Sequence, residues 1–92
     1  MDTHPTDLFY ASVLSRGKRW TTAHEVVASI VFSFRQRFEI AEVVDQISNL
    51  GGAPRVSRAT TYRILDSMVI AGLARRSESV FGSELYENTS RQ

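Results

Sequence analysis

Three side chains suited to binding nucleic acid recur along residues 57–71. Arg58, Tyr62 and Arg63 share one arc when residues are placed at about 100° per residue, and the small Ala59 lies between them. Arginine can form two hydrogen bonds at once to guanine, and tyrosine can bond a phosphate while it packs on a thymine methyl group. The spacing therefore predicts a helix face that contacts DNA, and the alternative is an ordinary solvated face.

Positive charge is concentrated in the same part of the chain. The net charge of all 92 residues is only +1, but residues 55–76 carry five arginines against one aspartate. Residues 21–52 carry four carboxylates against two arginines. Because the distribution of charge matters more than its total, this pattern favours an anionic partner for residues 55–76.

Further candidates flank the arginine-bearing arc. Ser57 suits the N-cap of a helix, and Thr60 in the first turn can join the free backbone N–H groups in binding a phosphate. Arg75 and Arg76 follow Gly72 on a predicted strand. Since neighbouring side chains on a strand point in opposite directions, at most one of them can face a DNA groove squarely. We expect at least one to contact DNA.

The composition argues against catalysis and metal binding. The chain has no cysteine, and its two histidines, His4 and His24, are not at ligand spacing, so we expect no metal site. We find no nucleophile–base motif and no phosphate-binding loop, so we expect no enzymatic activity. No apolar run approaches the roughly 20 residues that span a membrane, and the N-terminus is polar. These features predict a cytoplasmic protein with no membrane partner.

The apolar periodicity predicts the elements that position these residues. It indicates a first helix capped by Thr6 or Asp7 and ended near Gly17, a second from a Thr22–Glu25 capping box to about residue 34, a third from about Glu39, and a fourth over about 57–71. Gly51-Gly52-Ala53-Pro54 is expected to form the turn before the fourth helix, and Leu73–Ser77 and Glu84–Glu87 to form a hairpin around Gly82. This order predicts a mostly α fold with a small β-hairpin wing, a winged helix-turn-helix (α+β), as a single domain over 1–92 with 1–5 and 88–92 as flexible ends.

The opposite arc of the fourth helix is the predicted core face. Its members are Thr61, Ile64, Leu65, Met68 and Ala71. Trp20, beside Arg19, is predicted to cover the edge of the core, and the alternative is stacking on a DNA sugar.

The sequence of residues 57–76, SRATTYRILDSMVIAGLARR, resembles the recognition-helix pattern of the ferric uptake regulator (Fur) family, S-x-A-T-V-Y-R-x-L-x-x-L-x-x-x-G-L-V. Residues 15–21 (SRGKRWT) are similar to the connector of that family, residues 39–47 to its third helix, and residues 85–87 to the end of its wing. The matching positions in the recognition pattern are Ser57, Ala59, Thr60, Tyr62, Arg63, Leu65, Gly72 and Leu73.

The resemblance implies a role for each matching part. The helix of residues 57–71 would enter the major groove, and the wing of residues 73–87 would grip backbone phosphates. Tyr62 would touch thymine and the backbone, and Arg63 would contact phosphates or bases. Lys18 and Arg19 in the connector would reach the minor groove or the flanking backbone.

Metal sensing in this family uses parts that this sequence does not match. Family members usually bind zinc or iron, and dimerise, through a histidine-rich second domain that the 92 residues do not include. A metal-binding histidine before the third helix corresponds here to Arg37 or Phe38, and Glu87 matches a ligating glutamate without its histidine partners. His24 stands where the family usually has an arginine. We therefore expect no cofactor in this chain.

These observations predict the DNA-binding domain of a bacterial transcriptional regulator, a Fur-like repressor, with double-stranded DNA as its partner. The alternative is a winged-helix protein-interaction module that pairs with another regulator and reads no DNA sequence of its own. An exposed apolar patch would favour that alternative or a homodimer. The candidates for such a patch are Phe9, Tyr10, Phe32, Phe34 and Phe38.

Overall fold

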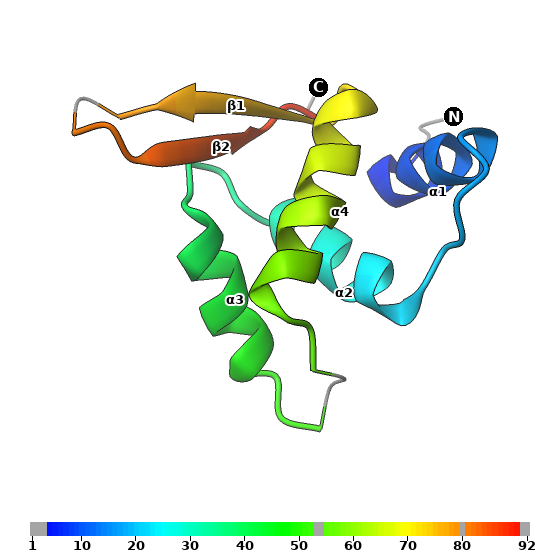
Figure 1. Cartoon of the computed structure of the whole chain (residues 1–92), viewed down its shortest axis with the longest axis horizontal. Coiled ribbons are helices and arrows are strands. Elements are labelled where there is room, and N and C mark those ends of the chain that lie inside the picture. The colour runs from blue at the N-terminus through cyan, green and yellow to red at the C-terminus, as the bar shows by residue number, and fades with distance from the viewer. Residues whose placement is uncertain (1–3, 53–54, 80, 91–92) are drawn as a thin grey trace.

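A computed structural model describes residues 4–52, 55–79 and 81–90 as four helices followed by a two-stranded antiparallel hairpin. The elements are α1 (Pro5–Ser15), α2 (Thr22–Val31), α3 (Ile40–Ser48), α4 (Arg58–Ile70), β1 (Ala74–Glu78) and β2 (Glu84–Asn88), arranged as Figure 1 shows. The predicted winged helix, mostly α with a small hairpin wing, is confirmed.

One core holds these elements together, and α4 lies at its centre. α4 packs against α2, α3 and β1, and α1 packs against α2. Figure 1 shows the hairpin extending from the C-terminal end of α4, beyond α3. The largest fully buried side chains are Tyr86, Phe9, Phe38, Leu65 and Met68, which come from both halves of the chain.

The first helix begins earlier than predicted. His4 is its N-cap, and the Nδ1 atom of His4 accepts a hydrogen bond from the backbone N–H of Thr6 at 3.1 Å. Thr6 and Asp7, the predicted caps, therefore lie inside α1. Pro5 explains the difference, because proline is favoured at the first helical position, where its missing N–H costs nothing.

The capping box of α2 lies one residue before the predicted Thr22–Glu25 pair. Thr21 Oγ1 accepts the N–H of His24 at 3.3 Å, and His24 Nδ1 accepts the N–H of Thr21 at 3.2 Å. Glu25 instead accepts a hydrogen bond from Trp20 Nε1 at 3.0 Å. The sequence contains two successive threonines, each followed three residues later by a side chain that can accept a hydrogen bond, so two capping boxes were possible. The extended backbone of Thr21 decides between them.

α2 ends at Val31, before the predicted limit of residue 34. The chain then crosses to the wing, where Phe38 forms an isolated antiparallel bridge with Tyr86. Asn88 also secures this crossing, because its side-chain amide donates to the carbonyl oxygens of Phe32 and Phe34 at 3.2 and 3.4 Å.

α3 begins one residue after the predicted start, with Glu39 as its N-cap. Ile40, Val43 and Ile47 are buried, whereas Leu50 follows the end of the helix and is exposed. Gly51 and Gly52 have φ angles of 57° and 71°, in the left-handed region that favours glycine. Ala53 and Pro54, the rest of the predicted turn, lie outside the described residues.

The ends of the chain are only partly described. Residues 1–3 and 91–92, which belong to the predicted flexible ends, lie outside the described residues. Pro5 is the first residue of α1, and Asn88 is the last residue of β2 and is buried. Among the described residues, no helix is long and apolar enough to cross a membrane.

Candidate nucleic-acid interface

The predicted division of α4 into two faces is confirmed. Thr61, Ile64, Leu65 and Met68 are buried, and Ala71, the C-cap of α4, is partly buried. On the opposite arc, Arg58, Ala59, Tyr62 and Arg63 are exposed, and Asp66, which the spacing also places there, is partly buried. α4 therefore presents two arginines and a tyrosine to solvent on one side while its other side anchors it in the core.

The start of α4 is organised by hydroxyl groups. Ser57 is the N-cap, as predicted, and its Oγ accepts the N–H of Thr60 at 3.0 Å. Thr61 has a structural role, because its buried Oγ1 donates to the carbonyl oxygen of Ser57 at 2.9 Å. Arg63 reaches Thr60 Oγ1 at 3.4 Å. Ser57, Thr60 and Arg63 thus form one polar surface at the N-terminal end of α4.

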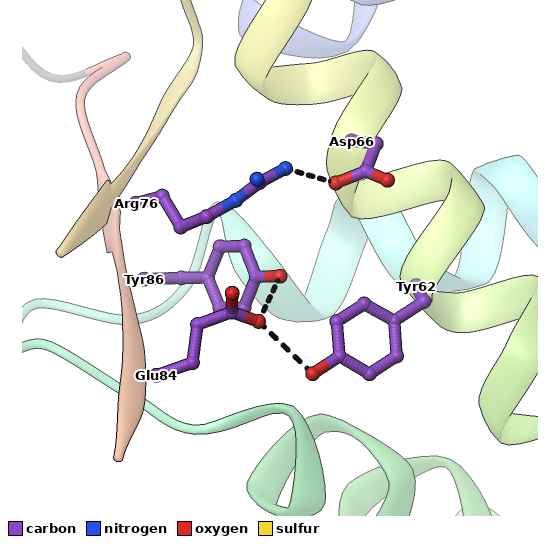
Figure 2. A network of polar contacts seen from close by, with 5 residues as sticks. All are labelled: Tyr62, Asp66, Arg76, Glu84 and Tyr86. Atoms are coloured by element: carbon purple, nitrogen blue, oxygen red, sulfur yellow. Dashed lines mark hydrogen bonds and ion pairs between the residues drawn. The ribbon is translucent and has the colours of Figure 1, made fainter. Parts of the chain in front are cut away.

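The Tyr62 side chain is held to the wing by Glu84, a carboxylate that is not among the predicted site residues. The Tyr62 hydroxyl donates to Glu84 Oε1 at 2.9 Å, and the Tyr86 hydroxyl donates to the same oxygen at 3.0 Å, as Figure 2 shows. The bond to Glu84, followed by desolvation and the nearby negative charge, raises the pKa of Tyr62. Burial, together with the bond to Glu84, raises the pKa of Tyr86. Both hydroxyls therefore remain protonated at neutral pH.

The two wing arginines are paired with carboxylates. Arg76 forms an ion pair with Asp66 of α4, shown in Figure 2, and its guanidinium lies 6.0 Å from the centre of the Tyr86 ring. Arg75 pairs with Glu87, its neighbour across the hairpin. The hydrogen bond from Arg75 lowers the pKa of Glu87. The guanidinium groups of the wing are thus less available to bind phosphates than the sequence suggests.

The connector between α1 and α2 brings a second group of cations to α4. Lys18 and Arg19 are exposed, as a role on DNA requires. Lys18 lines an open cleft together with Arg16 and with Arg63 of α4. Arg19 does not line this cleft. Arg16 was not a predicted site residue, although its place in the SRGKRW connector was a usable signal.

Trp20 lies at the edge of the core, as predicted. Its ring packs edge-on against Phe9 and Tyr10, with centroids 5.3 and 5.4 Å away, and stacks on His24 at 5.1 Å. Burial lowers the pKa of His24. Within residues 4–52, 55–79 and 81–90, no three histidine, aspartate or glutamate side chains are grouped so as to hold a metal ion.

The five aromatic residues that were candidates for an exposed apolar patch do not form one. Phe9 and Phe38 are fully buried, and Phe32 and Phe34 are partly buried against the core. Only Tyr10 of the five candidates is exposed, at 45%. The periodicity did not reveal this, because Phe38 lies outside any helix and is covered by Tyr86 of the wing.

The fold is that of a winged-helix domain with an exposed basic face, and comparison with solved structures finds the same fold in metal-uptake regulators. The Helicobacter pylori ferric uptake regulator matches with a TM-score of 0.80 at 16% identity, over 100% of this chain and 63% of that one. A manganese uptake regulator matches with a TM-score of 0.74 at 22% identity, over 99% of this chain and 64% of that one. The Vibrio cholerae ferric uptake regulator, described as having DNA-binding domains, matches with a TM-score of 0.69 at 20% identity, over 89% and 62%.

The predicted resemblance to the Fur family is therefore confirmed for the fold. This chain spans less than two thirds of the length of each of these three regulators. No family model and no curated protein matches the sequence.

Proposed function

We propose that this chain is the DNA-binding domain of a Fur-like transcriptional regulator, a cytoplasmic repressor that binds DNA and catalyses no reaction. α4 would enter the major groove, with Arg58 and Arg63 toward the bases and phosphates and with Ala59 and Tyr62 toward the bases. Ser57 and Thr60 would approach the backbone at the start of the helix. The solved structures with the same fold, one of which is described by its DNA-binding domains, support this proposal.

The single observation that carries the proposal is the state of the two arginines on α4. Arg58 and Arg63 are exposed, and among the described residues neither forms an ion pair with a carboxylate. Guanidinium groups on a rigid helix bind phosphate and guanine at a low cost in ordering. Lys18 and Arg16 border the same side of α4 and extend the positive surface toward the connector.

The proposed role of the wing is smaller than the sequence suggested. Arg75 and Arg76 are proposed to reach the DNA backbone only after exchanging Glu87 and Asp66 for phosphates. Both pairs are open to solvent, which screens them, so this exchange costs little. The connector and α4 would therefore provide most of the initial binding energy. Because the contact area of one domain on DNA is small, high affinity would require a dimer bound to a repeated site.

Mobility shifts against a random DNA pool at two salt concentrations test the proposal. We expect binding that weakens linearly in log affinity against log salt. Arg63→Ala should reduce the affinity and flatten the salt slope by about one, while Arg35→Ala, which removes an exposed arginine from the α2–α3 crossing, should change both much less. A folded Arg63→Ala protein that bound DNA as well as the wild type would contradict the docking of α4.

One observation favours the alternative of a protein-interaction module. Leu8, Tyr10 and Leu14 of α1 are exposed at 46%, 45% and 45%, although they are apolar or aromatic. A module that pairs through α1 would form a dimer, or a complex with another regulator, without DNA. A sizing column run on the wild type and on Leu14→Asp tests whether two copies pair through α1, since only that pairing predicts that the variant elutes later.

A further inference from the structure

The proton of the Tyr62 hydroxyl is already used within the protein. An ionised carboxylate can only accept hydrogen bonds, so both tyrosine hydroxyls that lie 2.9 and 3.0 Å from Glu84 Oε1 must donate to it. The Tyr62 ring is also held edge-on against the buried Tyr86 ring, with centroids 6.5 Å apart and planes at 70°. Figure 2 shows Tyr62 of α4 and Glu84 of β2 directed toward each other.

This arrangement decides what Tyr62 can offer to DNA. With its proton directed at Glu84, the hydroxyl oxygen has only acceptor lone pairs left. Glu84 is also exposed and also only accepts. Phosphate oxygens, guanine O6 and N7, and thymine O4 are acceptors as well, so none of them can bond to this pair. The groups in the major groove that can donate are the amino groups of cytosine and adenine.

We propose that Tyr62 and Glu84 together form a specificity-determining pair that selects cytosine in the major groove. This inference rests on the proposed function. Cytosine N4 is a donor that glutamate recognises, whereas adenine places the acceptor N7 beside its amino group, where it would repel the carboxylate. The resemblance to the Fur family implies contact of Tyr62 with thymine and backbone, so this proposal assigns the hydroxyl a different role.

The Glu84 carboxylate should also lower the overall affinity of the protein for DNA, which gives a second measurable effect. Glu84 is a negative charge beside the surface that approaches DNA, so it weakens binding to phosphates on every sequence. Removing the charge should therefore strengthen binding overall while the preference for cytosine is lost. A residue that only contacted phosphate or only stabilised the fold would not produce this combination.

The hairpin supplies a matched control. Glu78 is exposed and lies opposite Glu84 in the register of β1 and β2, and among the described residues its side chain has no hydrogen-bond or ion-pair partner. Glu78→Gln and Glu84→Gln remove the same charge from the same hairpin. They differ in the bonds from Tyr62 and Tyr86, which only Glu84 accepts.

The experiment is binding-site selection from a random DNA pool at low salt, followed by mobility shifts on sites that differ only at the selected position. The wild type and Glu78→Gln should prefer cytosine to guanine or thymine by about tenfold, and Glu84→Gln should lose most of that preference. Tyr62→Phe, which keeps the ring and removes the hydroxyl, should reduce the preference as well, and it provides a second variant if Glu84→Gln does not fold. Thermal melting confirms the fold of each variant.

The outcomes separate this inference from the proposed function. Wild-type protein that binds DNA but selects no cytosine, or folded variants of Glu84 and Glu78 with the same preference, would overturn the selective pair and leave the proposed function standing. Wild-type protein that binds no DNA at low salt would overturn both.

Discussion

Phe38 and Tyr86 exchange two backbone hydrogen bonds, at 2.9 and 2.8 Å, although they are far apart in the sequence. Both side chains are fully buried, and their rings stack with centroids 6.0 Å apart. Tyr86 in turn supports Tyr62 and Glu84. The crossing between α2 and α3 therefore anchors the wing against the exposed face of α4.

We expect Phe38→Ala to lower the free energy of unfolding by about 3–5 kcal/mol, because it removes a large buried ring and leaves a cavity. Urea denaturation followed by circular dichroism measures this change. Phe81→Ala is the control, since Phe81 is 89% exposed, and it should change stability by less than about 0.5 kcal/mol. Equal effects of the two variants would contradict the packing of Phe38.

The two threonines at the start of α2 should differ in their effect on stability. Thr21→Ala removes the N-cap side chain of α2 and should cost about 1 kcal/mol. Thr22→Ala changes an exposed residue inside the first turn and should cost much less. Thermal or urea denaturation of the two variants compares them directly. A larger loss of stability for Thr22→Ala than for Thr21→Ala would show that the capping box is the Thr22–Glu25 pair expected from the sequence.

His24 should make stability fall as the pH falls. Burial lowers the pKa of His24 below its ordinary value of 6.5, so the unfolded chain binds the proton more tightly than the folded one. The contribution to stability is present above pH 6.5 and is lost as the pH drops from 6.5 through the lowered pKa. Protonation also removes the acceptor Nδ1 that bonds the N–H of Thr21.

His24→Gln tests this pH dependence, because glutamine can serve in a capping box but does not titrate. The loss of stability between about pH 7 and pH 5 should be smaller in this variant than in the wild type. Melting temperatures measured across that range provide the comparison. Parallel curves for the two proteins would exclude His24 as the source of the dependence.

Asp66→Ala should increase the affinity for DNA, because it releases Arg76 and removes a negative charge from the face of α4. Arg76 then binds a phosphate without first giving up a carboxylate partner, so the affinity should rise across the salt series. Asp45→Ala is the control, since it removes an exposed carboxylate from α3. Mobility shifts across a salt series measure both variants, and an affinity of Asp66→Ala no higher than that of Asp45→Ala would show that Arg76 does not reach the DNA.

Local patterns were sufficient for much of this fold. The helical spacing of Ile64, Leu65 and Met68 correctly predicted which face of α4 is buried, because an apolar face must be covered by something whatever the partner is. Ser57 was correctly predicted as a cap for the same reason, since an N-cap acts within three residues of itself. Where the sequence offered two possible capping boxes, at Thr21 and at Thr22, the local pattern predicted the wrong one.

The sequence by itself determined the order of the elements, the buried face of α4 and the presence of arginines and Tyr62 on its exposed face. Only the tertiary structure decided which of those groups are free to bind. The bond from Tyr62 to Glu84 joins residues 22 positions apart, and the ion pair of Arg76 with Asp66 joins residues 10 positions apart. Such pairs depend on where the hairpin packs against α4. That position is set by the burial of Phe38 against Tyr86, a contact between distant parts of the chain that local spacing cannot predict.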